Sequence, residues 1–351
     1  MSSEEDQTRT SDNEEDRPRR RRRGWIIGGI VAGGLLLLTV AAVSLVLLVG
    51  LGETGGGGTA ASTTTYDEEY VSGEGSDKIA VIPVEGVISS ADSSVLGAEE
   101  TATPEGLQDA LRQAEEDSNV AAVILEVNSP GGGVTESAQM HGDILDFKKS
   151  AKKPVIVSMD ATAASGGYYI ATAADEIVAN SSTITGSLGV IFQLTNVSEA
   201  ADKLGVKQVI VKSGEFKDIG SPFRDLEPKE RDIFKSLIDE SYDEFVQVIS
   251  NGRDLQEEKV REIADGRIYS GSQARELDLV DELGDLEKAT DLTRDRANLD
   301  EATVIRYVQP ESFADLLQAR LSPPESEVAQ AMKSAGLNLE ARPYYIYKPG
   351  L

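Results

Sequence analysis

The residues with the clearest potential for chemistry lie around Ser165. The apolar run Val155 to Val157 predicts a short buried strand. The small residues Ala163 to Gly167 then predict a turn, and Tyr168 to Ala174 predict the start of a helix. In a strand-to-helix turn the backbone holds a serine hydroxyl out, and the amides at the helix N-terminus point toward any negative charge formed there. Ser165 is therefore a candidate nucleophile; the alternative is a serine that only caps the helix.

A glycine-rich turn supplies candidate partners for this serine. The nearly all-apolar run Val120 to Val127 is typical of a strand inside a parallel sheet. It continues into Asn128-Ser-Pro-Gly-Gly-Gly133, and a helix is expected from about Val134 to Lys149. Serine catalysis needs about two donors for the oxyanion, and the backbone amides of Gly132 and Gly166 are candidates. The structural alternative is a tight turn that leads into the helix.

A serine nucleophile also needs a proton acceptor, and this chain offers few. It has no cysteine and one histidine, His141, so thiolate chemistry and a multi-histidine metal site are excluded. His141 falls in the middle of a predicted helix, where we expect a solvated side chain. Lys217 differs from the other lysines because it lies in a loop beside Phe216 and near Ile219. A lysine acts as a base only where its surroundings favour the neutral form, so an exposed loop lysine is the alternative.

The elements that hold these residues alternate between strand and helix patterns. This alternation predicts a layered α/β fold with right-handed crossovers, and both glycine-rich turns leave strands at the edge where such folds usually carry their chemistry. Further strands are expected at Ile79–Val84, Glu176–Ala179 and Val209–Val211. Further helices are expected at Pro104–Asp117, Pro228–Gly252, Val260–Ala264 and Gly271–Leu277. The longest of them has an apolar face made of Ile233, Leu237, Ile238, Tyr242, Phe245, Val246 and Ile249.

The N-terminal region predicts attachment to a membrane. Residues 1–24 are polar and end in the arginine run Arg19 to Arg23, which predicts a disordered tail. The stretch from Ile26 to Leu51 carries no charge and would make a helix of roughly 39 Å, long enough to span a bilayer. It exceeds the apolar core of a cleavable signal peptide, so we expect an uncleaved anchor. The arginines put the N-terminus in the cytoplasm and the rest of the chain outside.

These patterns divide the chain into five parts. They are a cytoplasmic tail (1–24), a transmembrane anchor (25–51), a flexible linker rich in Gly, Thr and Ser (52–77), a catalytic domain (78–310) and a C-terminal extension (311–351).

The composition is strongly acidic. Asp and Glu number 61 against 34 Lys and Arg, which gives a formal net charge of −27. Because the excess is spread along the chain, it disfavours nucleic acid as a partner. Such a surface suits a protein that stays soluble in concentrated salt, so we predict a halophilic protein. Stability and full activity in dilute buffer would contradict that prediction.

Four short motifs follow one another along the chain. They are Asn128-Ser-Pro-Gly-Gly-Gly, Ala163-Ala-Ser-Gly-Gly-Tyr-Tyr, Thr185-Gly-Ser-Leu-Gly-Val, and Ser213-Gly-Glu-Phe-Lys-Asp followed by Ser221-Pro. In this order, over roughly residues 79–290, the motifs resemble the signal peptide peptidase A (SppA) family. The single N-terminal anchor is similar to the short form of that family, with one catalytic domain per chain. The resemblance implies a ClpP- and crotonase-like layered fold, with a mainly parallel sheet and flanking helices.

The resemblance also implies roles for individual residues. Ser165 matches the family's nucleophile, Lys217 its lysine base, and Ser187 the serine that hydrogen-bonds that lysine. Gly132 and Gly166 correspond to the oxyanion-hole amides. The implied activity is that of a membrane-anchored serine endopeptidase that hydrolyses cleaved signal peptides and similar peptides, with neither a cofactor nor a metal. Family members form ring or dome homo-oligomers in which a neighbour can complete the dyad or the groove.

Some alternatives stay open at this point. The related ClpP proteases carry a histidine downstream of the serine, where this chain has Leu188-Gly-Val-Ile191, and this agrees with a Ser-Lys dyad. A crotonase-like thioester enzyme is disfavoured because acyl-CoA is a cytoplasmic metabolite. A non-catalytic anchored scaffold that binds membrane-protein segments is the other alternative. The β-prone segment Tyr344 to Tyr347 is hypothesised to lie as a strand in a neighbour's groove.

Overall fold

The computed structural model describes residues 65–90, 101–310 and 343–346. All of them belong to one compact unit, Thr63–Leu351. The predicted tail and the predicted anchor over Ile26 to Leu51 lie outside the described residues. Within the described ranges, no helix combines the length and the hydropathy needed to cross a membrane.

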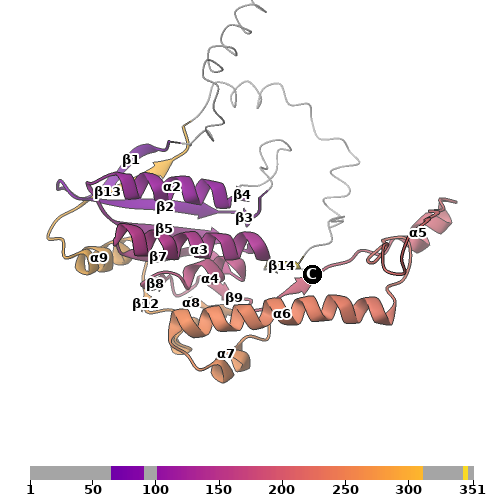
Figure 1. Cartoon of the computed structure of the whole chain (residues 1–351). Coiled ribbons are helices and arrows are strands. Elements are labelled where there is room, and N and C mark those ends of the chain that lie inside the picture. Colours follow the sequence, from indigo (N-terminus) through magenta and orange to yellow (C-terminus); the bar gives the residue numbers. More distant parts are fainter. Residues whose placement is uncertain (1–64, 91–100, 311–342, 347–351) are drawn as a thin grey trace, which may run out of the picture. The chain divides into compact units, whose positions relative to one another are not determined.

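A mostly parallel sheet forms the centre of the fold (Figure 1). Along its main path every neighbouring pair is parallel except the first, which is antiparallel. The order of the strands is β1 (Asp67–Ser72), β13 (Thr303–Val308), β2 (Lys78–Glu85), β5 (Val120–Ser129), β7 (Val155–Ala164), β8 (Glu176–Ala179) and β12 (Glu282–Leu283). Off this path, β9 (Ile184–Gly186) pairs in parallel with the end of β7, and β11 (Ile268–Ser270) pairs antiparallel with β9.

Helices cover both faces of this sheet, and this explains why the central strands are apolar throughout. Val123 and Leu125 of β5 face a core shared with α2 (Pro104–Glu116) and α3 (Val134–Ala151). Ile124 faces a second core, which is closed by α9 (Leu286–Ala297). The remaining helices are α4 (Gly166–Ala171), α5 (Ser198–Lys203), α6 (Pro228–Arg253), α7 (Glu257–Ile263) and α8 (Gly271–Glu276). The predicted α/β fold with a mainly parallel sheet is therefore confirmed.

A second, smaller sheet contains a segment from the C-terminal end of the chain. Its order is β10 (Ile191–Phe192), β14 (Pro343–Ile346), β6 (Gly131–Gly133), β3 (Val87–Ile88) and β4 (Thr101–Ala102). β14 is antiparallel to both of its neighbours, with Tyr345 opposite Gly132 and Tyr344 opposite Ile191. The prediction that this segment is extended is confirmed, and in the structure it pairs with strands of its own chain. Its place in a neighbour's groove stays a prediction.

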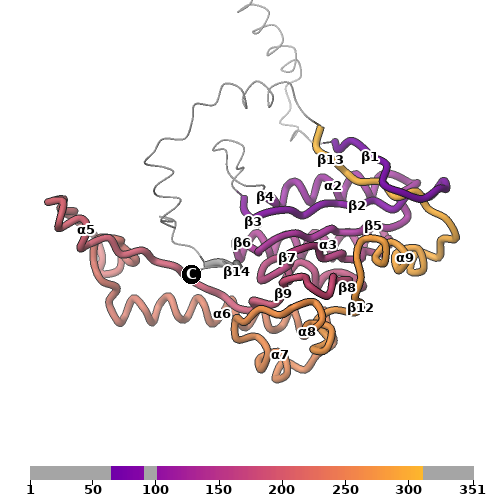
Figure 2. The backbone as a smooth tube through the Cα atoms, turned by 180° about the vertical axis from the view of Figure 1, so that it is seen from behind, coloured from indigo at the N-terminus to yellow at the C-terminus, as the bar shows by residue number. Residues whose placement is uncertain are grey.

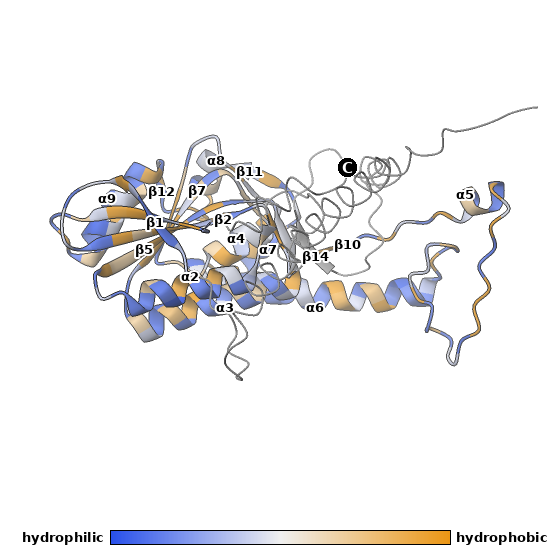
Figure 3. Ribbon diagram, turned by 90° about the horizontal axis from the view of Figure 1, so that it is seen from above, coloured by the Kyte–Doolittle hydropathy of each residue, from blue (hydrophilic) through white to orange (hydrophobic). Residues whose placement is uncertain are grey.

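One half of α6 packs on the core and the other half extends beyond the sheet. Figures 1 and 3 show α5 near the end of α6 that lies farthest from the sheet, and Figure 2 shows the same arrangement from behind. Phe245, Val246 and Ile249 are buried, whereas Ile233 and Leu237 on the predicted apolar face are exposed. We call residues 193–237 the arm. Its exposed apolar side chains are Leu204, Val206, Val209, Ile210, Val211, Phe216, Phe223, Ile233 and Leu237.

Two predictions about local structure are wrong. Val209–Val211 forms no strand: none of the described strands pairs with it, and Val211 is 97% exposed. The predicted flexible linker over 52–77 contains strand β1, which pairs with β13 and is exposed along its whole length. An exposed strand has no apolar alternation to reveal it, so its pairing partner decides its structure.

Candidate active site

Ser165 occupies a strained turn between β7 and α4. Its backbone has φ 56° and ψ −115°, a region that costs free energy for a residue with a side chain. The Ser165 amide donates to the carbonyl oxygen of Gly186 at 2.8 Å, and its own carbonyl accepts from the amide of Tyr169 at 2.8 Å. Strand β9 and helix α4 therefore hold the turn from two sides. This is the strand-to-helix geometry expected of an activated serine.

The alternative role for Ser165, a helix cap, is wrong. Ser165 is at the N-cap position of α4, but its side chain makes no capping hydrogen bond. Thr103 and Ser270, at the starts of α2 and α8, do make such bonds. Within residues 65–90 and 101–310, the Ser165 hydroxyl has no hydrogen-bond partner, and the residue is 1% exposed. The Ser165 hydroxyl therefore lies at the start of α4 but does not cap the helix.

The glycine-rich turn reaches the same edge of the sheet as Ser165. Ser129, at the end of β5, is aligned with Ala163 of β7. Gly132 is paired with Ile88 of β3. A Cβ atom at Gly132 would lie 1.9 Å from the carbonyl oxygen of Ile88, so no side chain fits at this position. A Cβ atom at Gly167 would lie 2.8 Å from the carbonyl oxygen of Ser129. These close approaches bring the glycine strand and the start of α4 together.

Ser129 is a supporting residue that the sequence reasoning missed. Its hydroxyl donates to the carbonyl oxygen of Gly86 at 2.6 Å and accepts from the amide of Gly131 at 3.1 Å. It is completely buried, and it ties the glycine strand to the chain that follows β2. Its place directly after an apolar strand and before Pro130 was the available signal. Through its bond to the Gly131 amide, the side chain fixes the start of the glycine strand, directly before Gly132.

Ser187 also lies at this edge. It has φ 50°, and its amide donates to the carbonyl oxygen of Arg267 at 2.7 Å. The residue before it, Gly186, accepts the hydrogen bond from the Ser165 amide and is aligned with Ala164. The structure therefore brings together four of the predicted site residues: Gly132, Ser165, Gly166 and Ser187.

Lys217, the fifth predicted site residue, is not part of this group. It lies in the arm between α5 and α6, next to Asp218, which Arg224 connects to Glu230 in the first turn of α6. This first turn is at the end of α6 farthest from α4 (Figures 1 and 3). Its side chain is exposed and makes no hydrogen bond or ion pair with any residue that the structure describes. Within one chain, the candidate nucleophile Ser165 and the candidate base Lys217 are therefore apart from each other.

His141 packs against the helix that follows the serine. Its ring lies 5.3 Å from the ring of Tyr169 in an edge-on arrangement, and Tyr169 in turn lies 5.2 Å from Phe245. Burial lowers the pKa of His141 to about 4, with a smaller contribution from the positive charge of Lys148. The predicted solvated side chain is thus wrong. His141 is half-buried and supports α4.

The depressed pKa of His141 predicts a pH-dependent stability. Because the folded state prefers the neutral imidazole, the unfolded state binds more protons between pH 6.5 and about 4, and stability falls as the pH falls through this window. The loss reaches up to about 3 kcal/mol at the lower end. We expect His141→Gln to have a flatter profile there, measured by urea unfolding of both proteins. Parallel profiles would contradict the assignment, since the chain has no other histidine.

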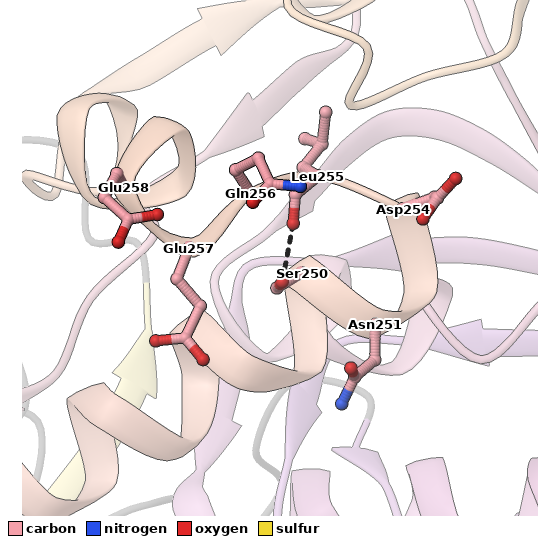
Figure 4. Close-up of a pocket in the computed structure, with 7 residues that line it drawn as sticks. All are labelled: Ser250, Asn251, Asp254, Leu255, Gln256, Glu257 and Glu258. Atoms are coloured by element: carbon pink, nitrogen blue, oxygen red, sulfur yellow. Dashed lines mark hydrogen bonds between the residues drawn. The ribbon is translucent and has the colours of Figure 1, made fainter.

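A polar hollow is present at the corner between α6 and α7, but it is separate from the predicted site. It has a volume of about 470 Å³ and is lined by Ser250, Asn251, Asp254, Leu255, Gln256, Glu257 and Glu258 (Figure 4). The Ser250 hydroxyl donates to the carbonyl oxygen of Leu255 at 2.5 Å, so it completes the end of α6. Among the described residues no group of acidic or histidine side chains is arranged to hold a metal ion.

Comparisons with known proteins point to one family. A family model described as Peptidase family S49 matches residues 147–300, which include Ser165, Ser187 and Lys217. An Enterococcus faecium protein named as a signal peptide peptidase SppA is 40% identical over 241 residues, which cover 69% of this chain and 70% of the relative. Protease 4 of Haemophilus influenzae is 38% identical over 239 residues, covering 68% of this chain and 38% of the relative.

A plant relative extends this similarity. The chloroplastic serine protease SPPA of Arabidopsis thaliana is 31% identical over 248 residues, covering 69% of this chain and 36% of the relative. The E. faecium protein matches over 70% of its own length. The chain therefore belongs to the SppA family of serine peptidases, peptidase family S49.

Proposed function

We propose that this peptidase is a membrane-anchored endopeptidase that cleaves spent signal peptides and similar membrane-associated peptides, with Ser165 as nucleophile and Lys217 as base. The observation that carries the proposal is the strained, buried turn at Ser165, whose hydroxyl does not cap the helix that it begins. Gly132 of the neighbouring strand β6 and Gly166 at the start of α4 are the proposed sources of the two backbone amides that acyl transfer requires.

The proposed reaction proceeds through an acyl-enzyme. The Ser165 oxygen attacks the peptide carbonyl carbon while its proton passes to the neutral amine of Lys217. The amides of Gly132 and Gly166 donate hydrogen bonds to the oxyanion, and Ser187 orients the lysine. As the C–N bond breaks, the protonated lysine gives its proton to the leaving amine. Water then hydrolyses the ester and releases the serine.

The position of Lys217 supports a dyad formed between two subunits. It lies on the arm, whose exposed apolar side chains include Val209 at 86% and Val211 at 97%. Exposed apolar surface of this kind marks a protein interface. We therefore include homo-oligomerisation in the proposal: the arm of one subunit brings Lys217 to Ser165 of the next.

The location follows from the residues before the catalytic unit. The uncharged stretch from Ile26 to Leu51 and the arginines before it support a single-pass anchor with the N-terminus in the cytoplasm. The catalytic unit then lies outside, next to the membrane in which cleaved signal peptides remain. The relatives from E. faecium and H. influenzae are named as a signal peptide peptidase and as a protease, which supports this substrate class.

Labelling with a fluorophosphonate tests the assignment of the nucleophile. We expect the wild-type chain to be labelled at Ser165 and to hydrolyse a peptide with small apolar residues. Ser165→Ala should lose the label and at least about 10³-fold in kcat. Ser158→Ala is the matched control, since Ser158 is a buried serine of β7, the strand that leads into Ser165. Labelling that persists in Ser165→Ala would refute the assignment, and a folded wild-type chain that is never labelled would favour the scaffold.

The acidic composition supports the proposal of a halophilic protein. With a formal net charge of −27, repulsion between surface carboxylates weakens as salt is added. The labelling and hydrolysis assays should therefore be run both in dilute buffer and in molar salt. A chain that is equally stable and active in dilute buffer is not halophilic.

Strand β14 supports a prediction about access to the groove. It is paired between β6 and β10, as an extended peptide substrate would be, with Tyr345 opposite Gly132. We expect a chain that ends at residue 342 to have a KM about 10-fold lower, because a tethered competitor acts at high effective concentration. A synthetic peptide of residues 343–351 should then inhibit the shortened enzyme. Unchanged KM and no inhibition would show that β14 does not compete with substrate.

A further inference from the structure

The turn that carries Lys217 is held by a network of charged side chains. Arg224 donates through Nε to Oδ2 of Asp218 at 3.2 Å and through Nη2 to the backbone carbonyl of Asp218 at 3.1 Å. Asp218 directly follows Lys217. From the other side, Lys212 donates to Oδ1 of Asp218 at 2.6 Å. Hydrogen bonds thus fix both the carboxylate and the backbone carbonyl of Asp218, the residue after Lys217.

The same arginine connects this turn to helix α6. Its Nη1 donates to Oε2 of Glu230 at 2.8 Å, and Glu230, in the first turn of α6, is 1% exposed. Glu230 also accepts from the backbone amide of Glu227 at 3.0 Å and so belongs to the cap of the helix. The hydrogen bonds from Arg224 hold the pKa of Asp218 at about 2 and lower the pKa of Glu230. The network is therefore fully charged at neutral pH.

Glu215, two residues before the lysine, adds further contacts: its carbonyl oxygen accepts from Lys212 at 2.7 Å, and its carboxylate accepts from Lys229 at 3.0 Å. Residues 206–227 contain no helix or strand, and the Lys217 amide makes one long hydrogen bond, 3.3 Å, to the carbonyl oxygen of Gly214. A second anchor is Gly220, which has φ 73° and no side chain, so that the chain lies against Phe234 and Leu194. A lysine side chain has a flexible four-carbon stem, so the position of its amine depends on where the backbone is held.

We propose that Arg224 is a positioning residue for Lys217: by bridging Asp218 and Glu230 it holds the lysine turn at a fixed place on the end of α6. This inference rests on the proposed role of Lys217 as the base. Misplacing a catalytic group by about 1 Å can lower the rate by about 10²-fold. An arginine is required because its planar fork reaches the carboxylates of both elements and a backbone carbonyl at once, which a lysine cannot do.

The test compares full-length variants in mild detergent. We expect Arg224→Gln to lower kcat by about 10- to 100-fold with KM changed by less than about 2-fold. Arg224→Lys keeps the charge and should recover only part of the loss. Arg253→Gln is the matched control, because Arg253 makes a two-bond ion pair with Asp281 at the other end of α6. It should lower the melting temperature and leave kcat unchanged well below that temperature.

A double-mutant cycle separates positioning from general destabilisation. If Arg224 acts through Lys217, adding Arg224→Gln to Lys217→Ala should not further slow the labelling of Ser165 by a fluorophosphonate. Should Arg224→Gln fail to fold, Glu230→Gln removes one charge of the same bridge and replaces it in the cycle. Additive effects, or wild-type kcat in both Arg224→Gln and Glu230→Gln, would overturn the inference.

The outcome for Lys217→Ala alone separates this inference from the proposed function. If Lys217→Ala retains activity, the lysine is not the base and the proposed dyad is wrong. If Lys217→Ala is inactive but Arg224→Gln has normal kcat, the dyad stands and only the positioning role of Arg224 fails.

Discussion

Lys217→Ala is expected to lower kcat/KM by about 10³-fold or more, and activity should return when this variant is assembled together with Ser165→Ala. Each variant alone lacks one half of every dyad. Lys217 is exposed on the arm between α5 and α6, whereas Ser165 directly precedes α4, and Figure 1 shows α5 and α4 far apart. A subunit that has lost its serine can therefore still supply its lysine to a neighbour, if the dyad forms between chains.

The size of the recovery can be calculated. When equal amounts of the two variants assemble at random, about a quarter of the sites combine an intact serine with an intact lysine, so about a quarter of the wild-type activity is expected. Coexpression with two different affinity tags isolates the mixed assemblies. The control is Ser165→Ala assembled with the double variant Ser165→Ala/Lys217→Ala, which has no intact site.

Two results would change the proposed mechanism. Mixed assemblies without recovered activity would mean that the dyad forms within one chain, which would require the arm to fold back. Near-normal activity of Lys217→Ala alone would mean that another group is the base. His141 would then be tested first, although its burial against Tyr169 and its pKa of about 4 make it a weak base.

Gly132→Ala is expected to lower kcat by about 10²- to 10³-fold, the effect of losing one oxyanion donor. The added Cβ atom would lie 1.9 Å from the carbonyl oxygen of Ile88, so strand β6 has to move away from β3. That movement displaces the amide that we assign to the oxyanion hole. It also disturbs the strand that pairs with β14, so KM for peptides should rise as well.

Gly142→Ala is the matched control for this substitution. Gly142 is in helix α3, and a Cβ atom there would contact nothing within 4 Å. Alanine in a helix interior is more favourable than glycine by about 1 kcal/mol, so this variant should be fully active and slightly more stable. Urea unfolding and steady-state kinetics on both variants provide the comparison. Full activity of Gly132→Ala would show that the Gly132 amide is not an oxyanion donor.

Local patterns predicted most of the central fold. Strand β8 has the predicted bounds, Glu176–Ala179, and α6 begins at Pro228 as predicted. Long apolar runs and helix-start residues carry this information because their burial and capping are decided within a few neighbouring residues. The same reasoning failed for Val209–Val211, whose β-prone residues pair with no strand in the part of the chain that the structure describes.

Ser165, Gly132 and Gly166 were named from local patterns, because glycine and serine at strand ends imply a backbone that must turn or approach closely. The roles of Ser187 and Lys217 followed only from the resemblance to a known family. The strand-to-helix turn at Ser165 followed from local patterns in the sequence, whereas Gly131–Gly133 was expected to form a turn and is strand β6. Their meeting at one edge follows from the pairing of β5 with β7, which joins residues distant in the chain. The buried support from Ser129 was visible only in three dimensions.

Tertiary structure alone decided where Lys217, His141 and the C-terminal segment lie. The direction in which α6 leaves the core places Lys217 on an exposed arm, and the packing of α3 on α4 buries His141 against Tyr169. The open edges of β6 and β10 accept Pro343–Ile346. Each of these outcomes depends on contacts between segments far apart in the chain. Local sequence patterns specify which residues tend to be buried or extended, but not which distant surface they meet.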